Sequence, residues 1–96
     1  MAEPLTVDDF RPHVGETFVV RAEDGAGPEL EMVEARGLGE SFREREAFAL
    51  LFRGPAEPAL PQATYRLDHD RLGALEIFIV PVACSDAGAD YEAIFT

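Results

Sequence analysis

Thr64-Tyr65-Arg66-Leu67-Asp68-His69 is the stretch that decides the fold. Apolar or aromatic side chains occupy its odd-numbered positions, and polar or charged ones occupy its even-numbered positions. Because successive side chains of a β-strand point to opposite faces, this period of two is typical of a strand with one dry and one wet face. We therefore expect a strand over residues 64–69 that buries Leu67 and exposes Arg66.

Apolar runs of similar length lie on both sides of this stretch, and glycine- and proline-rich segments separate them. They are rich in aromatic and β-branched residues, which favours strands over helices. A bulge near Met32-Val33 would reconcile the two apolar phases of one run. The further strands are predicted at about residues 17–22, 29–36, 46–53, 74–80 and 91–96.

Turn chemistry sets the predicted strand ends. Residues 24–28 read Asp-Gly-Ala-Gly-Pro and predict a hairpin loop, and Gly37-Leu38-Gly39 predicts a second break. Residues 70–73 predict a tight turn, and residues 85–90 predict a loop. Pro81 lacks a backbone N–H, so we expect it at a strand end or on an edge.

The N-terminal part predicts a short helix over residues 6–13, after a flexible tail at residues 1–5. Thr6 can cap the helix, and Asp8 and Asp9 lie where the helix dipole favours carboxylates. A helix this short is marginal alone, so Phe10 must dock onto a larger core.

Together these elements predict one mainly β domain over residues 1–96, with the antiparallel sheet at residues 16–96. About six antiparallel strands would form a small meander barrel, closed or half open. Residues 40–46 combine helix propensity with strand alternation, and strand, helix and loop all stay open there. Apolar residues on both faces of the strand at 46–53 suggest that it is covered on both sides, for example by the N-terminal helix.

The charge balance limits the possible partners. Eight arginines oppose nineteen aspartates and glutamates, which gives a net charge of −11. Such a surface disfavours nucleic acid and anionic membranes, since both are bound through basic patches. We expect another protein as the partner, and a charged partner would be basic or a cation.

Cys84 is the only cysteine, so no disulfide can form within the chain and a reducing compartment is expected. No signal peptide is visible at the start of the sequence, and the apolar run at residues 77–84 is too short to span a bilayer. These features predict a cytoplasmic protein. Cys84 itself is expected to be a small buried hydrophobe rather than a nucleophile, because no base is placed beside it.

Asp68-His69-Asp70 is the one local cluster of residues that could bind a metal. In a strand His69 points away from both aspartates, so the three cannot grip one ion. We expect His69 to end the dry face of its strand at an exposed rim, and His13 to lie at a frayed helix end.

The loop at residues 85–90 is the weak candidate for cation binding, through Asp86, Asp90 and Glu92. Its spacing does not match a calcium-binding EF-hand loop, so a solvated polar loop is the expected structure. Four aromatic residues could line a pocket, but a barrel of six strands encloses little space and core packing is expected. These four are Tyr65, Phe78, Tyr91 and Phe95. No catalytic residue, cofactor or metal is therefore expected.

Several segments together resemble a bacterial domain family of unknown function. They are residues 48–55 (Phe-Ala-Leu-Leu-Phe-Arg-Gly-Pro), residues 60–69 (Leu-Pro-Gln-Ala-Thr-Tyr-Arg-Leu-Asp-His), residues 78–81 (Phe-Ile-Val-Pro) and residues 91–95 (Tyr-Glu-Ala-Ile-Phe). The chain has Ala49 where the family commonly has Ser, and Ala63 where it commonly has Gly. The resemblance carries over no catalytic residue. It implies a structural or accessory role, with an association with neighbours that resemble phage-tail collar proteins.

The leading hypothesis is a non-enzymatic interaction or structural module of a bacterial protein assembly, since a well-patterned core occurs without a recognisable catalytic site. The first alternative is a domain that binds a small ligand or a cation through the 85–90 loop. The second is an enzyme of unknown class, in which His69 or Cys84 would have to meet a partner in a cleft.

Overall fold

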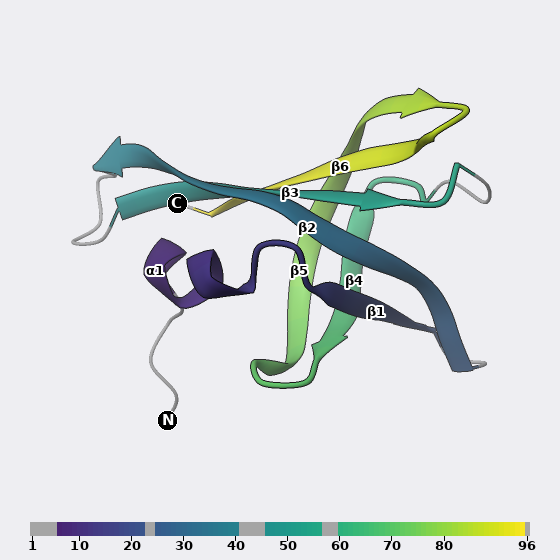
Figure 1. The fold of residues 1–96 in the computed structure, drawn as a ribbon, viewed down its shortest axis with the longest axis horizontal. Coiled ribbons are helices and arrows are strands. Elements are labelled where there is room, and N and C mark those ends of the chain that lie inside the picture. The colour runs from purple at the N-terminus through teal and green to yellow at the C-terminus, as the bar shows by residue number, and fades with distance from the viewer. Residues whose placement is uncertain (1–5, 23–24, 41–45, 57–59, 96) are drawn as a thin grey trace.

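Six antiparallel strands and a short N-terminal helical segment make up the described part of the protein (Figure 1). The computed structural model describes residues 6–22, 25–40, 46–56 and 60–95, so the tail expected at residues 1–5 lies outside the described residues. The elements in chain order are α1 (Val7–Phe10), the 3-10 helix η1 (Arg11–His13), β1 (Thr17–Ala22), β2 (Gly25–Glu40), β3 (Glu46–Gly54), β4 (Ala63–His69), β5 (Gly73–Ser85) and β6 (Gly88–Phe95).

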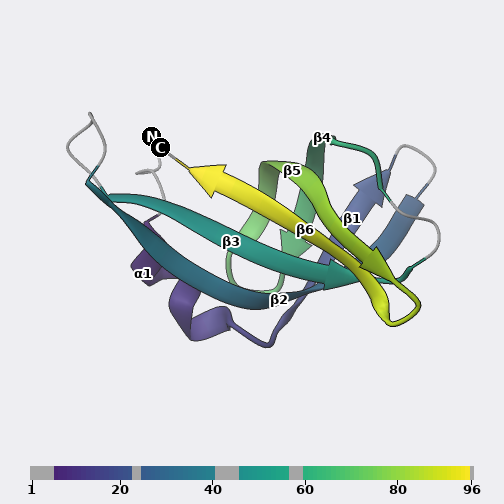
Figure 2. The same cartoon turned by 90° about the horizontal axis from the view of Figure 1, so that it is seen from above.

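The strands close into a barrel in the order β1-β2-β3-β6-β5-β4, which confirms the expected fold class. Each half of the chain is a three-stranded meander. Pairing of β1 with β4 and of β3 with β6 joins the halves, so the strand order departs from the chain order where the chain passes from β3 to β4. Figure 2 shows β2, β3 and β6 running side by side in one curved layer.

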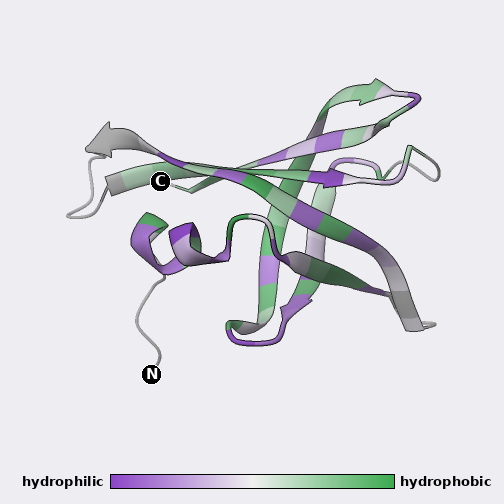
Figure 3. Cartoon of the chain, in the orientation of Figure 1, coloured by the Kyte–Doolittle hydropathy of each residue, from purple (hydrophilic) through white to green (hydrophobic). Residues whose placement is uncertain are grey.

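The predicted alternation places the core. Leu67 on β4 is buried and Arg66 is exposed, as expected. Figure 3 shows the corresponding alternation of hydrophilic and hydrophobic bands along β2. The largest fully buried side chains are Phe10, Phe18, Leu30, Met32, Phe48, Leu50, Phe52, Leu67, Ile79 and Tyr91.

The helical segment covers this core at one end. The ring of Phe10 lies 5.7 Å from that of Phe48 and 6.0 Å from that of Phe95, measured between centroids. The expected docking of Phe10 is thus confirmed. Neither helix in the described parts of the chain is long and apolar enough to cross a membrane.

Strand β2 is longer than predicted, because both expected breaks lie within it. The predicted loop at residues 24–28 is strand from Gly25 onward, and β2 continues through residues 37–39 to Glu40. Gly27 packs closely against β1, where an added Cβ would lie 3.2 Å from the carbonyl oxygen of Val20. The expected bulge is present, since the register shifts between Met32 and Glu34. Gly27 therefore serves close strand packing here rather than a turn.

Strands β5 and β6 also extend beyond their predicted ends. Strand β5 runs through Pro81 to Ser85, and β6 begins at Gly88, so the expected loop at residues 85–90 shrinks to a tight turn. The β5–β6 register shifts between Pro81 and Ala83, so the irregularity follows directly after the residue that cannot donate a ladder hydrogen bond. Cys84 lies near the end of this extension and is exposed, which corrects its expected burial.

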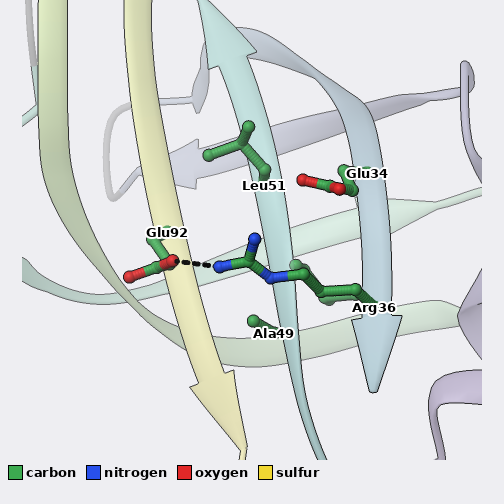
Figure 4. A pocket seen from close by; sticks show the side chains of 6 residues that line it. Glu34, Arg36, Ala49, Leu51 and Glu92 are labelled. Carbon is green, nitrogen blue, oxygen red and sulfur yellow. Dashed lines mark ion pairs between the residues drawn. The ribbon is translucent and has the colours of Figure 1, made fainter. Parts of the chain in front are cut away.

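The outer face of β3 is covered by side chains rather than by the helix. Arg36 on β2 reaches across β3 and pairs with Glu92 on β6 at 3.5 Å, above Ala49 and Leu51 (Figure 4). Ala49 is buried as a result, although it points out of the barrel. The hollow under this pair measures only about 70 Å³ and is also lined by Glu34, so it offers little room for a ligand.

Candidate functional site

Two histidines and a glutamate from distant parts of the chain meet near the turn between β4 and β5. His13 ends η1, Glu16 lies just before β1, and His69 ends β4. Their side-chain nitrogen and oxygen atoms lie within 4.8 Å of one another, and within the described residues no other three potential metal ligands converge in this way. An open hollow of about 380 Å³ adjoins Glu16 and His69, lined also by Asp70 and Arg71.

Glu16 holds the two histidines through one oxygen atom. Its Oε1 accepts a hydrogen bond from His13 Nδ1 at 2.8 Å and another from His69 Nε2 at 2.7 Å. The His69 side chain is only 3% exposed, whereas that of Glu16 is 46% exposed. The two imidazole rings meet edge to face with centroids 4.6 Å apart, and the His69 ring packs at the same distance on Phe18. We call this arrangement of His13, Glu16 and His69 the Glu16 clasp.

The β4–β5 turn fixes which nitrogen of His69 carries the proton. His69 Nδ1 accepts hydrogen bonds from the backbone N–H groups of Arg71 and Leu72, both at 3.1 Å. A neutral imidazole accepts at one nitrogen and donates at the other. The proton therefore sits on Nε2, which donates to Glu16.

This tautomer opposes metal binding. A histidine that ligates a metal through Nε2 donates its Nδ1–H to a second partner, but here Nδ1 faces two N–H donors. The spacing also differs, since ligands 2.0–2.1 Å from a tetrahedral zinc ion lie about 3.3 Å apart, whereas the clasp contacts are 2.7 and 2.8 Å. The geometry is that of a hydrogen-bonded clasp rather than a metal centre.

The clasp lowers the pKa of Glu16. The hydrogen bond from His13 is the largest cause and the bond from His69 the second, because both favour the ionised carboxylate. Glu16 therefore binds its two donors as an anion over the neutral pH range. The clasp joins η1, the segment before β1 and the end of β4 at one point.

The sequence-based cation candidates do not come together. Asp86 is exposed in the β5–β6 turn. Asp90 pairs with Arg53 at 2.8 Å, and this hydrogen bond lowers the pKa of the Asp90 carboxyl. Glu92 pairs with Arg36. Arginine thus already engages two of the three carboxylates, which leaves them poorly placed to share an ion.

The residues considered for catalysis are separated as well. His69 pairs with Gly73 at the start of β5, whereas Cys84 pairs with Ala89 near the other end of that strand. Asp68 points away from His69, as predicted, and accepts hydrogen bonds from Arg21 and Arg66. His69 is buried, which corrects the expected exposed rim, and His13 packs on it instead of lying at a frayed end.

The four aromatic candidates divide between core and surface. Tyr91 is buried, and its hydroxyl oxygen accepts a hydrogen bond from the Leu60 N–H at 2.7 Å. Tyr65 and Phe95 are partly buried against the core, as expected. Phe78 departs from the expectation, because it is 49% exposed on the outside of β5.

Most of the exposed large hydrophobic side chains in the described residues lie on two adjacent strands. The described residues include four large hydrophobic side chains that are exposed, and three of them, Phe78, Val82 and Ile94, lie on β5 and β6. Val80 pairs with Glu92 in the β5–β6 ladder. Phe78 lies two positions before Val80 on β5, and Ile94 lies two positions after Glu92 on β6. We call Phe78, Val82 and Ile94 the β5–β6 face.

Comparison with known proteins identifies the family. The family model described as a domain of unknown function (DUF6916) matches residues 5–95. The chain belongs to this family. Neither a curated protein nor a solved structure gives a significant match.

Proposed function

For this member of a family without an assigned activity, we propose a role as a protein interaction module that docks its partner on the β5–β6 face. The observation that carries the proposal is the exposure of Phe78, Val82 and Ile94 on two adjacent strands. Their neighbours Ile77, Ile79 and Ala93 are buried and already supply the core. The fold therefore does not need the three exposed side chains, and grouped exposed hydrophobes are typical of interaction surfaces.

The charge of the chain defines the partner's chemistry. With a net charge of −11, the surface repels acidic proteins and a second copy of itself. A partner with an apolar centre and a basic rim would bury the face and gain attraction at its edges. The proposal is thus a heterologous protein partner.

The test compares the wild type with a variant of the face and a matched control. Phe78→Ser combined with Ile94→Ser removes the centre of the face, and Val14→Ser removes the fourth exposed hydrophobe, which lies outside β5 and β6. Tagged proteins are incubated with native lysate at physiological salt, after circular dichroism has shown that each is folded. We expect the wild type and Val14→Ser to retain the same stoichiometric protein and the double variant to lose it. Retention by all three, or no stoichiometric partner at all, would contradict the proposal.

We propose a non-enzymatic role because the functional groups of the alternatives are engaged or apart. The ring nitrogens of His69 and the carboxylates of Asp90 and Glu92 have partners within the protein. An accessory role in a bacterial assembly, with neighbours resembling phage-tail proteins, is supported by the family resemblance alone. The single cysteine supports a cytoplasmic setting.

A further inference from the structure

Strand β5 pairs with a different neighbour along each part of its length. Residues 73–79 pair with β4, and pairing with β6 begins at Val80 and continues to Ser85. The edge of residues 73–79 that faces away from β4 therefore has no strand beside it within the described residues. In Figure 1, β5 and β6 turn away from each other beyond the segment over which they pair.

Beyond its pairing with β5, β6 also has a strand edge without a described neighbour. Residues 93–95 of β6 pair with β3 and extend past the point where pairing with β5 stops. Apart from β4 and β6, no described helix or strand has a Cα atom within 8 Å of a β5 Cα atom. The unpaired N–H and C=O groups of β5 are thus left for an added strand, the form in which sheet edges commonly bind peptides.

We infer that an extended segment of a partner protein adds to β5 as a new strand along residues 73–79. This inference rests on the proposed interaction function and deepens it. Phe78 lies within residues 73–79 of β5 and Ile94 within residues 93–95 of β6, and both are exposed, so they can supply apolar contacts for alternate side chains of the segment. Backbone hydrogen bonds to β5 supply the remaining attraction.

Glu76 specifies the charge of the segment. It is exposed in the middle of the open edge and lies opposite Arg66 in the β4–β5 ladder. Arg66 Nε, however, bonds Asp68 Oδ1 at 3.0 Å. Within the described residues no cationic group lies within 4.0 Å of the Glu76 carboxylate, so this carboxylate can attract a lysine or arginine of an incoming strand.

Glu76 also argues against a second copy as the occupant. Two β5 edges paired antiparallel about their centres would bring the two Glu76 carboxylates opposite each other, and like charges there are destabilising. The segment that fits alternates apolar residues with at least one basic residue over about five to seven positions. This is a heterologous basic-apolar strand.

The experiment selects such segments even though the partner protein is unidentified. A display library of random nine-residue peptides is panned against the full chain, and the most enriched peptide is synthesised for fluorescence-anisotropy titration. We expect enriched peptides to alternate apolar residues with Lys or Arg. Phe78→Ser should weaken binding more than tenfold, Glu76→Gln about two- to fivefold, and Val14→Ser not measurably.

Hydrogen exchange separates strand addition from simple docking on the face. If the peptide adds to β5, amides of residues 74–78 that point away from β4 should exchange more slowly when it is bound. Peptides that require Phe78 but leave these amides unprotected would overturn strand addition while the proposed docking function stands. The inference would be overturned if no alternating peptide were enriched, or if peptides bound Phe78→Ser and Glu76→Gln as tightly as the wild type. A dimer formed through β5 in sedimentation experiments would overturn it as well.

Discussion

Replacing His69 by phenylalanine should destabilise the protein even though it makes a buried position more apolar. Phenylalanine keeps a planar ring that can pack on Phe18, which now lies 4.6 Å from the imidazole. It removes the acceptor for the backbone N–H groups of Arg71 and Leu72. The prediction therefore isolates the polar role of His69 from its packing role.

The expected loss follows from the two turn hydrogen bonds. A partly buried N–H that loses its acceptor costs about 1–2 kcal/mol, so the two together cost about 2–4 kcal/mol. Nothing is added for the bond to Glu16, because that carboxylate is half exposed and water can replace His69 there. A domain of this size has a stability of about 5–14 kcal/mol, so the variant should still fold and remain measurable.

Urea unfolding followed by circular dichroism gives the free energy, and amide exchange locates the loss. The amides of Arg71 and Leu72 should exchange faster in His69→Phe than in the wild type. His69→Asn is the control, since its side-chain oxygen can accept from the same N–H groups, and it should keep both amides protected. Equal or greater stability of His69→Phe, with both amides still protected, would refute the role assigned to Nδ1.

Three further changes test the packing and the charge of the fold. Gly88→Ala should lower the free energy of unfolding more than Gly73→Ala. Both glycines have a positive φ, but only a Cβ at residue 88 would lie 2.7 Å from a backbone carbonyl oxygen. Equal losses in urea unfolding would contradict this reason. Phe10→Ala should lower the free energy of unfolding by about 3–5 kcal/mol, whereas Val14→Ala, at an exposed position, should change it by less than about 0.5 kcal/mol. A Phe10→Ala loss below about 1 kcal/mol would show that the helix is not docked. Glu16→Gln should flatten the acid side of the stability–pH curve. The stabilisation from the lowered pKa of Glu16 is complete above about pH 4.3 and is lost as the pH falls through the lower folded-state pKa. Parallel stability–pH curves for wild type and variant would contradict the clasp.

The sequence predicted the existence of the strands better than their lengths. Alternation is a local signal, so residues 64–69 could be assigned to a strand with Leu67 inside. The glycines of β2 and Pro81 of β5 gave equally clear local signals for breaks, but ladders with neighbouring strands keep these segments extended. Tertiary pairing overrode turn propensity at both places.

The clasp shows what local reading of the sequence misses. The spacing of His13 and Glu16, three residues apart, is visible in the sequence, but their partner His69 is brought to them only when β1 pairs with β4 and closes the barrel. The exposure of Phe78 was also hidden. It lies in an unbroken apolar run with Ile77 and Ile79, where periodicity cannot tell the inner face from the outer one.

The clasp and the proposed binding edge meet at the β4–β5 turn. His69 holds the N–H groups of Arg71 and Leu72, and the open edge of β5 begins at Gly73, which pairs with His69 itself. An edge that starts from a fixed turn loses little conformational entropy when a strand is added, so more of the hydrogen-bond energy is available for affinity. We therefore expect the Glu16 clasp to stabilise the fold and also to keep the β5 edge ordered for its proposed partner, although it touches no part of the β5–β6 face.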